Sequence, residues 1–322
     1  MPAILTHYTF ARFEGVNPER KHFGALVLGS QGPDPFFFYG MLPWKKRGGS
    51  KAVNTFGSGL HKREVTALYM AMIDYANKSE DKELLFDFIE GVYLHYILDR
   101  NCHPFVYSRA GYKEDDSKEA KYYSAFHTKF ESALDIIYAK EKGVYKEEPS
   151  FALKTITDDE LHKISKMIYE ANKSSDNIPG LDENSFFTSV KDYISVVKFV
   201  NKPHGLKRWF LKTFFGSDAV AFALNYPRDL EKTYGKVDFL NAEKSEWPNP
   251  VSGKKRNESW YELMANAKKE YLEFLPLLEK AKNGEDISKE AHEFYNGIDH
   301  NGVKDGAIKK YMDPVLPYVE GK

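Results

Sequence analysis

The sequence predicts an all-α protein, organised as a single multi-helix domain over residues 1–322. From Val65 onward, apolar residues recur at three- and four-residue steps over long stretches, which is the periodicity of helices with one buried face. No run alternates polar and apolar residues for long enough to predict a sheet. We find no internal repeat and no low-complexity linker, so the sequence indicates no boundary between domains.

Long helices are expected over residues 66–77, 81–101 and 117–140. Pro104 is expected to end the second of them, because the residue before a proline disfavours helical geometry. Further helices are predicted at residues 158–172, 183–200, 207–215, 259–282, 288–295 and 302–311. Residues 1–64 are punctuated by Gly, Pro and Ser and are predicted to be largely irregular, with at most a short helix from Phe10 or Phe23.

Composition excludes several classes of protein. The formal net charge is −1, with cations and anions scattered along the chain, so neither nucleic acid nor an anionic membrane is indicated as an obligate partner. The one cysteine, Cys102, cannot form an intramolecular disulfide, which fits a reducing compartment. The amino terminus lacks a signal-peptide pattern, and no stretch reaches the roughly 18 apolar residues of a membrane span, so we expect a cytoplasmic protein.

Two pairs of a histidine and a carboxylate are the strongest chemical signal in the chain. His95 precedes Asp99, and His127 precedes Glu131, each by four residues, so the members of a pair share one face of a helix. Both pairs continue an apolar stripe, where a carboxylate is costly unless it is paired or bound to a cation. One such pair can be an ordinary core hydrogen bond. Two pairs together with His103 favour a zinc site, since imidazole and carboxylate are zinc ligands.

Three further donors precede these helices. His7, Asp34 and His61 lie in segments predicted to be loops or the entry to a helix, from which side chains can reach a shared centre. Asp34 stands between two prolines, a rigid presentation that suits a ligand and equally suits an ordinary turn. Taken singly, each of the three is explained as simply by a structural role. Four histidines that fit no motif are expected at the surface, namely His162, His204, His292 and His300.

In their order, these donors resemble the zinc-dependent phospholipase C family, which shares its fold with the single-strand-specific zinc nucleases. The family pattern is an early His, an Asp, a His, then His-x3-Asp, another His, and finally His-x3-Glu or His-x3-Asp. This chain supplies His7, Asp34 in GSQGPDPFFF, His61 in LHKRE, His95 and Asp99 in HYILD, His103 in CHP, and His127 and Glu131 in HTKFE. The resemblance covers about residues 1–135, and its GxxGPDxFF and HYxLDxxxHP segments are similar to the branch without a signal peptide.

The resemblance implies a site with two or three zinc ions. One zinc would be held by Asp34, His61, His95 and Asp99. The second would be held by His103, His127 and Glu131. A third ion would be shared by His7 and Asp99 with the free amine and carbonyl of the processed first residue.

The chain departs from the family pattern at three places. Secreted members expose a Trp as their first residue, whereas removal of Met1 here would expose Pro2. The step from Asp34 to His61 is longer than in the family, and the step from Asp99 to His103 is shorter by two. A site with two metals is therefore an open alternative. Cys102, beside His103, is expected to be an inert small residue rather than a soft metal ligand.

The resemblance implies an enzyme that hydrolyses phosphoric ester bonds, similar to phospholipase C. Zinc lowers the pKa of bound water, so a metal-bound hydroxide would attack the phosphate, with Asp34 as ligand and proton acceptor. The expected substrate is a phospholipid or another small phosphodiester. A nuclease or phosphatase that uses the same metals is an alternative, and so is a non-catalytic binding protein whose helices zinc stabilises.

Two aromatic segments bear on the substrate. Residues 36–39, Phe-Phe-Phe-Tyr, could line an apolar mouth beside the metals, or pack in the core. Residues 206–215 mix cations with large rings, as interfacial helices do, so a transient contact with a membrane surface is open. Core packing explains that second segment more simply. No Ser–His–Asp or Cys–His arrangement and no phosphate-binding glycine loop competes with the metal hypothesis.

Overall fold

The computed structural model describes residues 4–15, 19–146, 149–201, 229–304, 306–307 and 309–320. Helices dominate these residues, and their strands form a single short hairpin, so the predicted all-α fold is confirmed. The α-helices are α1 (Ile4–Glu14), α2 (Phe23–Gly29), α3 (Ser50–His61), α4 (Thr66–Asn77), α5 (Lys82–Ala110), α6 (Lys118–Glu141), α7 (Asp158–Ser174), α8 (Ser185–Asn201), α11 (Leu230–Tyr234), α12 (Trp260–Lys282) and α13 (Ser288–Tyr295). The other elements are the 3-10 helices η1 (Asp34–Phe38), η2 (Pro43–Lys45) and η3 (Pro149–Leu153), with strands β1 (Trp247–Pro248) and β2 (Lys255–Arg256).

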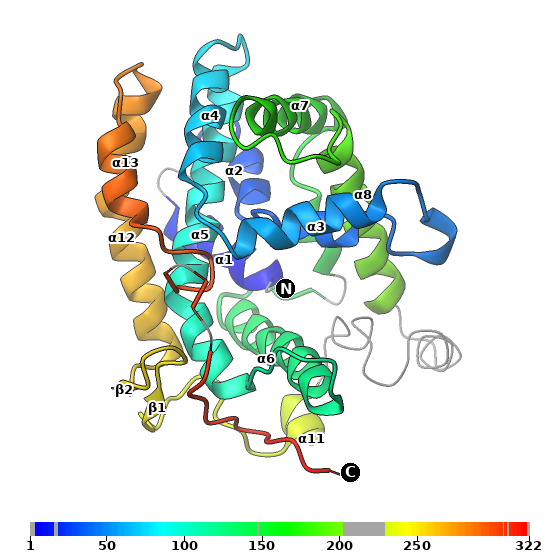
Figure 1. Cartoon of the computed structure of the whole chain (residues 1–322), viewed down its shortest axis with the longest axis vertical. Coiled ribbons are helices and arrows are strands. Elements are labelled where there is room, and N and C mark those ends of the chain that lie inside the picture. The colour runs from blue at the N-terminus through cyan, green and yellow to red at the C-terminus, as the bar shows by residue number, and fades with distance from the viewer. Residues whose placement is uncertain are drawn as a thin grey trace.

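Helix α5 is the axis of the molecule. It runs along the long dimension in Figure 1, with α12 and α13 on one side and α7 and α8 on the other. It contacts α1, α2, α4, α6, α7 and α12. Because neighbours surround it, most of its side chains are buried on every face, between Leu84 and Ala110. Ionisable side chains on α5 therefore face protein rather than solvent.

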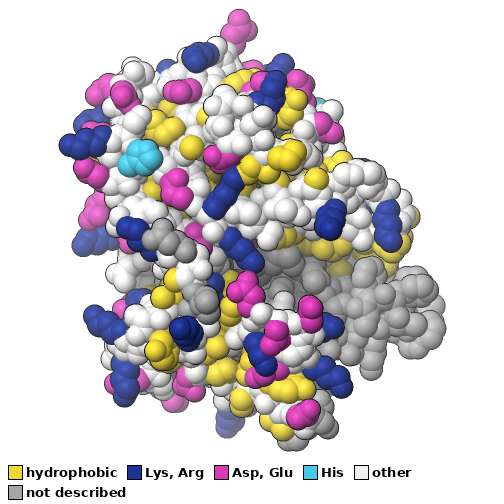
Figure 2. All heavy atoms as spheres, viewed as in Figure 1, with side chains coloured by type: hydrophobic (Ala, Val, Ile, Leu, Met, Phe, Trp, Pro, Cys, Tyr) yellow, Lys and Arg dark blue, Asp and Glu magenta, His cyan; other side chains and the backbone are white. Residues whose placement is uncertain are grey.

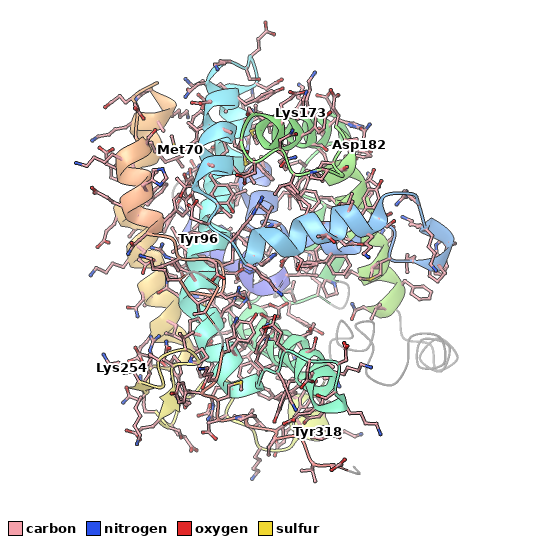
Figure 3. All side chains as sticks on the ribbon, in the orientation of Figure 1. Met70, Tyr96, Lys173, Asp182, Lys254 and Tyr318 are labelled. Carbon is pink, nitrogen blue, oxygen red and sulfur yellow. The ribbon has the colours of Figure 1, made fainter. Side chains whose placement is uncertain are left out.

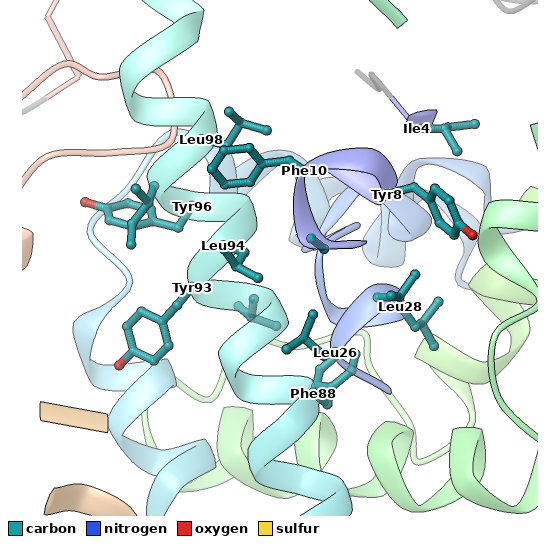
Figure 4. Close-up of a cluster of buried hydrophobic side chains, with 14 of the residues drawn as sticks. Ile4, Tyr8, Phe10, Leu26, Leu28, Phe88, Tyr93, Leu94, Tyr96 and Leu98 are labelled. Atoms are coloured by element: carbon teal, nitrogen blue, oxygen red, sulfur yellow. The ribbon is translucent and has the colours of Figure 1, made fainter. Parts of the chain in front are cut away.

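The core beside α5 is built by α1 and α2. In Figure 4, Leu26 of α2 lies against Phe88 of α5, and Phe10 of α1 lies against Leu98 of α5; all four are buried. Helix α2 can come this close because Gly91 has no side chain: a Cβ there would lie 2.1 Å from the backbone oxygen of Leu26. The close approach brings the segment that follows α2 next to α5.

The prediction that residues 1–64 are largely irregular is wrong. They include α1, α2 and α3, of which only the helix starting at Phe23 was anticipated. In α1 every residue from Ile4 to Ala11 is buried. A helix that is buried on all sides shows no amphipathic stripe, so the periodicity that reveals surface helices is missing there.

Pro104 does not end α5, which continues to Ala110. A proline inside a helix removes one hydrogen bond and costs about 3 kcal/mol. The next two residues, Phe105 and Val106, are almost completely buried, and burial of such side chains contributes about 1.5–3 kcal/mol each. The gain from burial therefore outweighs the cost of the proline, and the longer helix also carries His103 on the same face as Asp99.

The helix predicted at residues 302–311 is also wrong. The described residues there form an isolated bridge between Ile298 and Lys304 followed by irregular chain. The bridge exists because Asp299 bonds to Val303, both through its backbone N–H and through its side chain. The helix predicted at residues 207–215 lies outside the described residues. The other predicted helices are confirmed within a few residues of their ends.

None of the described helices is long and apolar enough to cross a membrane.

Asp135 of α6 holds the first turn of α1. Its two carboxylate oxygens accept hydrogen bonds from the backbone N–H groups of Leu5, at 3.0 Å, and Thr6, at 2.7 Å. The first N–H groups of a helix have no partner within the helix, and a negative charge there is also favourable to the helix dipole. Because Asp135 is fully buried, the contact fixes α1, and with it His7, against α6.

Replacing Asp135→Ala should lower the free energy of unfolding by about 2–3 kcal/mol, because two buried N–H groups lose their acceptor. Urea denaturation followed by circular dichroism measures this. Asp135→Asn is the matched control: it keeps the shape but has one amide oxygen, so we expect a smaller loss. An alanine variant as stable as the parent would mean that other contacts hold α1.

Candidate metal centre

Eight ionisable side chains converge where α1, α3, α5 and α6 meet the segment after α2. All are buried or nearly so: the exposed fraction of the side chain runs from 0% for His95 to 12% for His127. They are the eight donors singled out in the sequence, namely His7, Asp34, His61, His95, Asp99, His103, His127 and Glu131. Their donor atoms form three groups, in each of which the atoms lie within 4.8 Å of one another.

The first group is Asp34, His61 and His95. Asp34 begins η1 between its two prolines, and His61 is the last residue of α3. The Nε2 atom of His61 lies 3.0 Å from Oδ1 of Asp34. His95 approaches them from the middle of α5, so three separate elements supply one donor each.

The second group is His7, His95 and Asp99. The two carboxylate oxygens of Asp99 lie 3.1 Å from Nε2 of His7 and 3.0 Å from Nε2 of His95. The rings of His7 and His95 are stacked with their centroids 4.2 Å apart. His95 therefore belongs to two groups. Asp99, which the resemblance placed both with Asp34 and His61 and with His7, falls in the group of His7.

The third group is His103, His127 and Glu131, as the resemblance implied. Oε1 of Glu131 lies 3.3 Å from Nε2 of His103 and 3.2 Å from Nε2 of His127. The Nε2 atom of His103 is also 3.7 Å from Oδ1 of Asp99. Asp99 thus stands between His95 and His103 on one face of α5 and connects the third group to the other two.

Three of the histidines are oriented by backbone carbonyl groups. The Nδ1 atoms of His61, His95 and His103 lie 2.9, 3.0 and 2.7 Å from the carbonyl oxygens of Gly57, Ser30 and His300 respectively. A carbonyl oxygen only accepts, so each Nδ1 carries the hydrogen. When the ring is neutral, its Nε2 atom presents a lone pair to the centre, which is the usual arrangement of histidine ligands to zinc.

The centre needs positive charge. Burial alone would raise the pKa of Asp99, yet His103, His95 and His7 hold it well below the usual range. The pKa of Glu131 is also well below its usual range despite burial, and His127 and His103 are among the groups that lower it. For His103, burial alone would lower the pKa, but the carboxylates of Asp99 and Glu131 raise it to about 9. Buried carboxylates of this kind are stabilised by protons on the histidines or by a cation.

The donors fit zinc. Imidazole nitrogen and carboxylate oxygen are both zinc ligands, and each group offers three of the four donors that a tetrahedral ion takes. His95 is counted in two groups, but its one free nitrogen can bind only one ion at a time. The Nε2 atom of His95 has no hydrogen-bond partner among the described residues, although Asp99 lies 3.0 Å away, so its buried lone pair is available to a cation. Cys102 is buried, which raises the pKa of its thiol, and it belongs to no donor group of the described residues.

Comparison with known protein families matches the part of the chain that carries the donors. The zinc-dependent phospholipase C family matches residues 1–198, which is more than half of the chain and includes all eight donors. The chain belongs to the zinc-dependent phospholipase C family. No curated protein and no solved structure gives a significant match. The amino-terminal ligand that the family suggests would come from residues 1–3, which lie outside the described residues.

Gly32, in the Gly-Pro-Asp segment at residues 32–34, makes room for His95. Its φ of +50° is a conformation that side chains disfavour. A Cβ at this position would lie 2.3 Å from Cδ2 of the His95 ring. Gly32 therefore allows the turn before Asp34 to lie directly on the ring that two donor groups share.

The expectation that His300 lies at the surface is wrong, because the side chain is fully buried. Its carbonyl accepts the hydrogen bond from His103, and its Nε2 lies 3.2 Å from the hydroxyl of Tyr69. Burial holds the pKa of His300 well below its usual value. Of the other three histidines, His162 and His292 are exposed as expected, and His204 lies outside the described residues.

His300 belongs to a brace, residues 298–303, that sequence reasoning missed. Asn301 donates to the carbonyl of His61 at 2.7 Å and accepts from the hydroxyl of Tyr107 at 2.7 Å. Tyr96, labelled on α5 in Figure 3, donates to the carbonyl of Ile298 at 2.7 Å. The brace lies beyond the matched family region, and its only sequence signal is the turn-like run Asp-His-Asn-Gly at 299–302.

The aromatic segment at residues 36–39 is mostly core. Phe36 and Phe38 are buried, and Phe38 stacks on Tyr193 with the ring centroids 3.8 Å apart. Only Phe37 is partly exposed, with its ring 5.1 Å from that of His61. The second aromatic segment, residues 206–215, lies outside the described residues.

Gly32→Ala should weaken zinc binding at least tenfold, because the added methyl group displaces the His95 ring. Titration of the metal-free protein against a chromophoric zinc chelator measures the affinity. Gly59→Ala is the matched control, since a Cβ at Gly59 meets no atom within 4 Å. Equal affinities for the two variants would show that the His95 ring is not part of a zinc site.

Asn301→Ala should also weaken zinc binding, by about 10–100-fold, as loss of an outer hydrogen bond to a metal ligand does. The cause differs from that in Gly32→Ala. Here the carbonyl of His61 loses a hydrogen bond, whereas no side chain is displaced. We expect Lys304→Ala, an exposed change next to the brace, to leave the zinc affinity unchanged. If Asn301→Ala binds zinc as tightly as the parent does, residues 298–303 pack over the centre but do not position its ligands.

Proposed function

We propose that this protein is a zinc-dependent hydrolase of phosphodiester bonds, acting on a phospholipid or another small phosphodiester. The observation that carries the proposal is that the donor groups share residues. His95 belongs to two groups, and Asp99 connects them to the third, so ions held there would be close neighbours. When bound, zinc ions lower the pKa of water and neutralise charge on phosphate oxygens, which is the chemistry that phosphodiester hydrolysis requires. Membership of the zinc-dependent phospholipase C family supports the proposal.

The proposed ligands are the eight donors, with zinc bound by two or three groups. Asp34 is proposed to have a second role as proton acceptor. Burial alone would raise the pKa of its carboxyl, but the hydrogen bond from His61 and the charge of His95 lower it, so Asp34 is ionised at neutral pH. A buried, ionised carboxylate beside the metal-binding histidines is suited to take a proton from an attacking water molecule.

The exposure of the donors indicates where substrate would enter. His127 and His61 are the most exposed of the eight, at 12% and 10% of the side chain, whereas His95 is inaccessible. Phe37 lies beside His61 and is partly exposed. We therefore place the substrate on the side of His61 and His127, with Phe37 next to an apolar part of it.

Surface charge favours a small substrate over a long nucleic acid. On the face shown in Figure 2, Lys and Arg side chains are interspersed with Asp and Glu. Binding along a nucleic-acid backbone depends on a continuous positive surface. A nuclease or phosphatase working with the same metals is the second candidate within the enzyme class, and the assay below separates it from the first.

Zinc-loaded protein should hydrolyse bis(p-nitrophenyl) phosphate and short-chain phospholipid, lose this activity with a chelator and regain it with zinc. Asp34→Asn should lower kcat at least 100-fold, and Asp74→Asn, an exposed change, is the matched control. Elemental analysis of each sample gives the zinc content. Full zinc without turnover of any phosphodiester would instead indicate a metal-stabilised binding protein, and selective cleavage of single-stranded DNA would indicate a nuclease.

A further inference from the structure

Lys309 brings a cation close to the third donor group. Its ammonium nitrogen lies 4.3 Å from the ring centroid of Tyr107 and 4.8 Å from that of Tyr112. The Tyr107 ring in turn lies 4.8 Å from the ring of His127 and 5.9 Å from that of His103. A single tyrosine ring therefore separates the ammonium group from two of the proposed ligands. Tyr107 itself is held in place by Asn301.

The ammonium group of Lys309 has no ion-pair partner among the described residues, although the side chain is partly buried. Asp299 and Glu114 act on it through space, but neither carboxylate forms an ion pair with it. The oxygens of Asp299 accept hydrogen bonds from Asn301 and Val303 instead. Burial lowers the pKa of Lys309. A partly buried cation without a direct ion pair is costly, so an anion supplied from outside the chain would be bound favourably.

A second cation lies on the same side of the centre. Lys62 directly follows His61, is exposed, and has no ion pair within the described part of the chain. Its charge acts on Lys309 through space, so the positive potentials of the two ammonium groups add. Two neighbouring cations beside the proposed phosphate-binding centre raise the positive potential there, which attracts anions.

The rings of Tyr107 and Tyr112 already contact the ammonium group of Lys309. Faces of Tyr rings are the usual binding surface for a quaternary ammonium group. Here the faces of Tyr107 and Tyr112 contact the protein's own ammonium group, so a cationic head group would meet like charge rather than an open aromatic site. Tyrosine rings without a lysine over them would attract a choline group. With Lys309 over the rings, this position instead attracts a negatively charged group.

We propose that Lys309 and Lys62 form an anion subsite, which selects phosphodiesters whose head group carries a second anion, a phosphomonoester or a carboxylate, over those whose head group is a quaternary ammonium group. Hydrolysis then breaks the bond between phosphorus and the diacylglycerol oxygen, diacylglycerol leaves, and the head group stays on the phosphate. The inference rests on the proposed function, because it names the substrate class of the same centre. The structural alternative is that Lys309 only packs the C-terminal segment onto Tyr107.

The test compares two short-chain phospholipids with the same acyl chains, phosphatidylinositol 4-phosphate and phosphatidylcholine. For the zinc-loaded parent we expect kcat/KM to be at least tenfold higher for the first. Lys309→Met should abolish this preference through KM, with kcat on phosphatidylcholine and zinc content unchanged. Lys310→Met, at the exposed neighbouring position, is the matched control and should keep the parent's preference.

A binding measurement gives a readout independent of turnover. Calorimetry with inositol 1,4-bisphosphate on the zinc-loaded protein should show a Kd about tenfold higher for Lys309→Met than for the parent. Lys309→Arg keeps the charge and should retain both affinity and preference. Lys62→Gln should weaken binding in the same direction, and it keeps the inference testable if Lys309→Met fails to fold.

The outcomes separate this inference from the proposed function. If the zinc-loaded parent fails to hydrolyse bis(p-nitrophenyl) phosphate, the proposed function fails, and calorimetry alone decides whether the anion subsite exists. If the parent is active but prefers phosphatidylcholine, or if Lys309→Met and Lys62→Gln leave the preference and the Kd unchanged, the anion subsite is wrong and Lys309 has a packing role.

Discussion

Three carboxylates, those of Asp34, Asp99 and Glu131, lie buried at the point where the helices meet, and their negative charge must be balanced by protons or by metal ions. Five histidine rings surround them, and for His103 the effect is large enough to raise the pKa to about 9. The rest of the centre follows from this requirement. Each ring must face the carboxylates with the correct nitrogen, and the backbone must come close enough to orient it.

The scaffold meets that requirement with contacts from distant parts of the chain. The turn after α2 reaches His95 because Gly32 has no side chain, and it orients the ring through the carbonyl of Ser30. The first turn of α1 is held by Asp135, one turn beyond Glu131 on α6, so the helix that positions His7 is attached to the helix that supplies the third group. Stability and metal binding therefore depend partly on the same residues.

Sequence reasoning succeeded where the signal is local. The four-residue spacing of His95 and Asp99, and of His127 and Glu131, places each pair on one face of a helix, and the structure brings all eight predicted donors together. The sequence-based predictions were wrong where burial by distant parts of the chain overrides helical periodicity or the effect of proline. Helix α1 is surrounded by protein and shows no amphipathic period. Helix α5 continues through Pro104 because the residues beyond the proline are buried on all sides.

The sequence by itself determined the helical class, a set of candidate donors and the family that their order resembles, because helical periodicity and ligand spacing are properties of neighbouring residues. Only the tertiary structure decided that His95, rather than Asp99, is common to the group of Asp34 and the group of His7. It also decided that His300 and Asn301 brace the centre and that Lys309 lies beside Tyr107. These contacts join residues about 200 positions apart, and no local pattern in a sequence specifies a pairing over that distance.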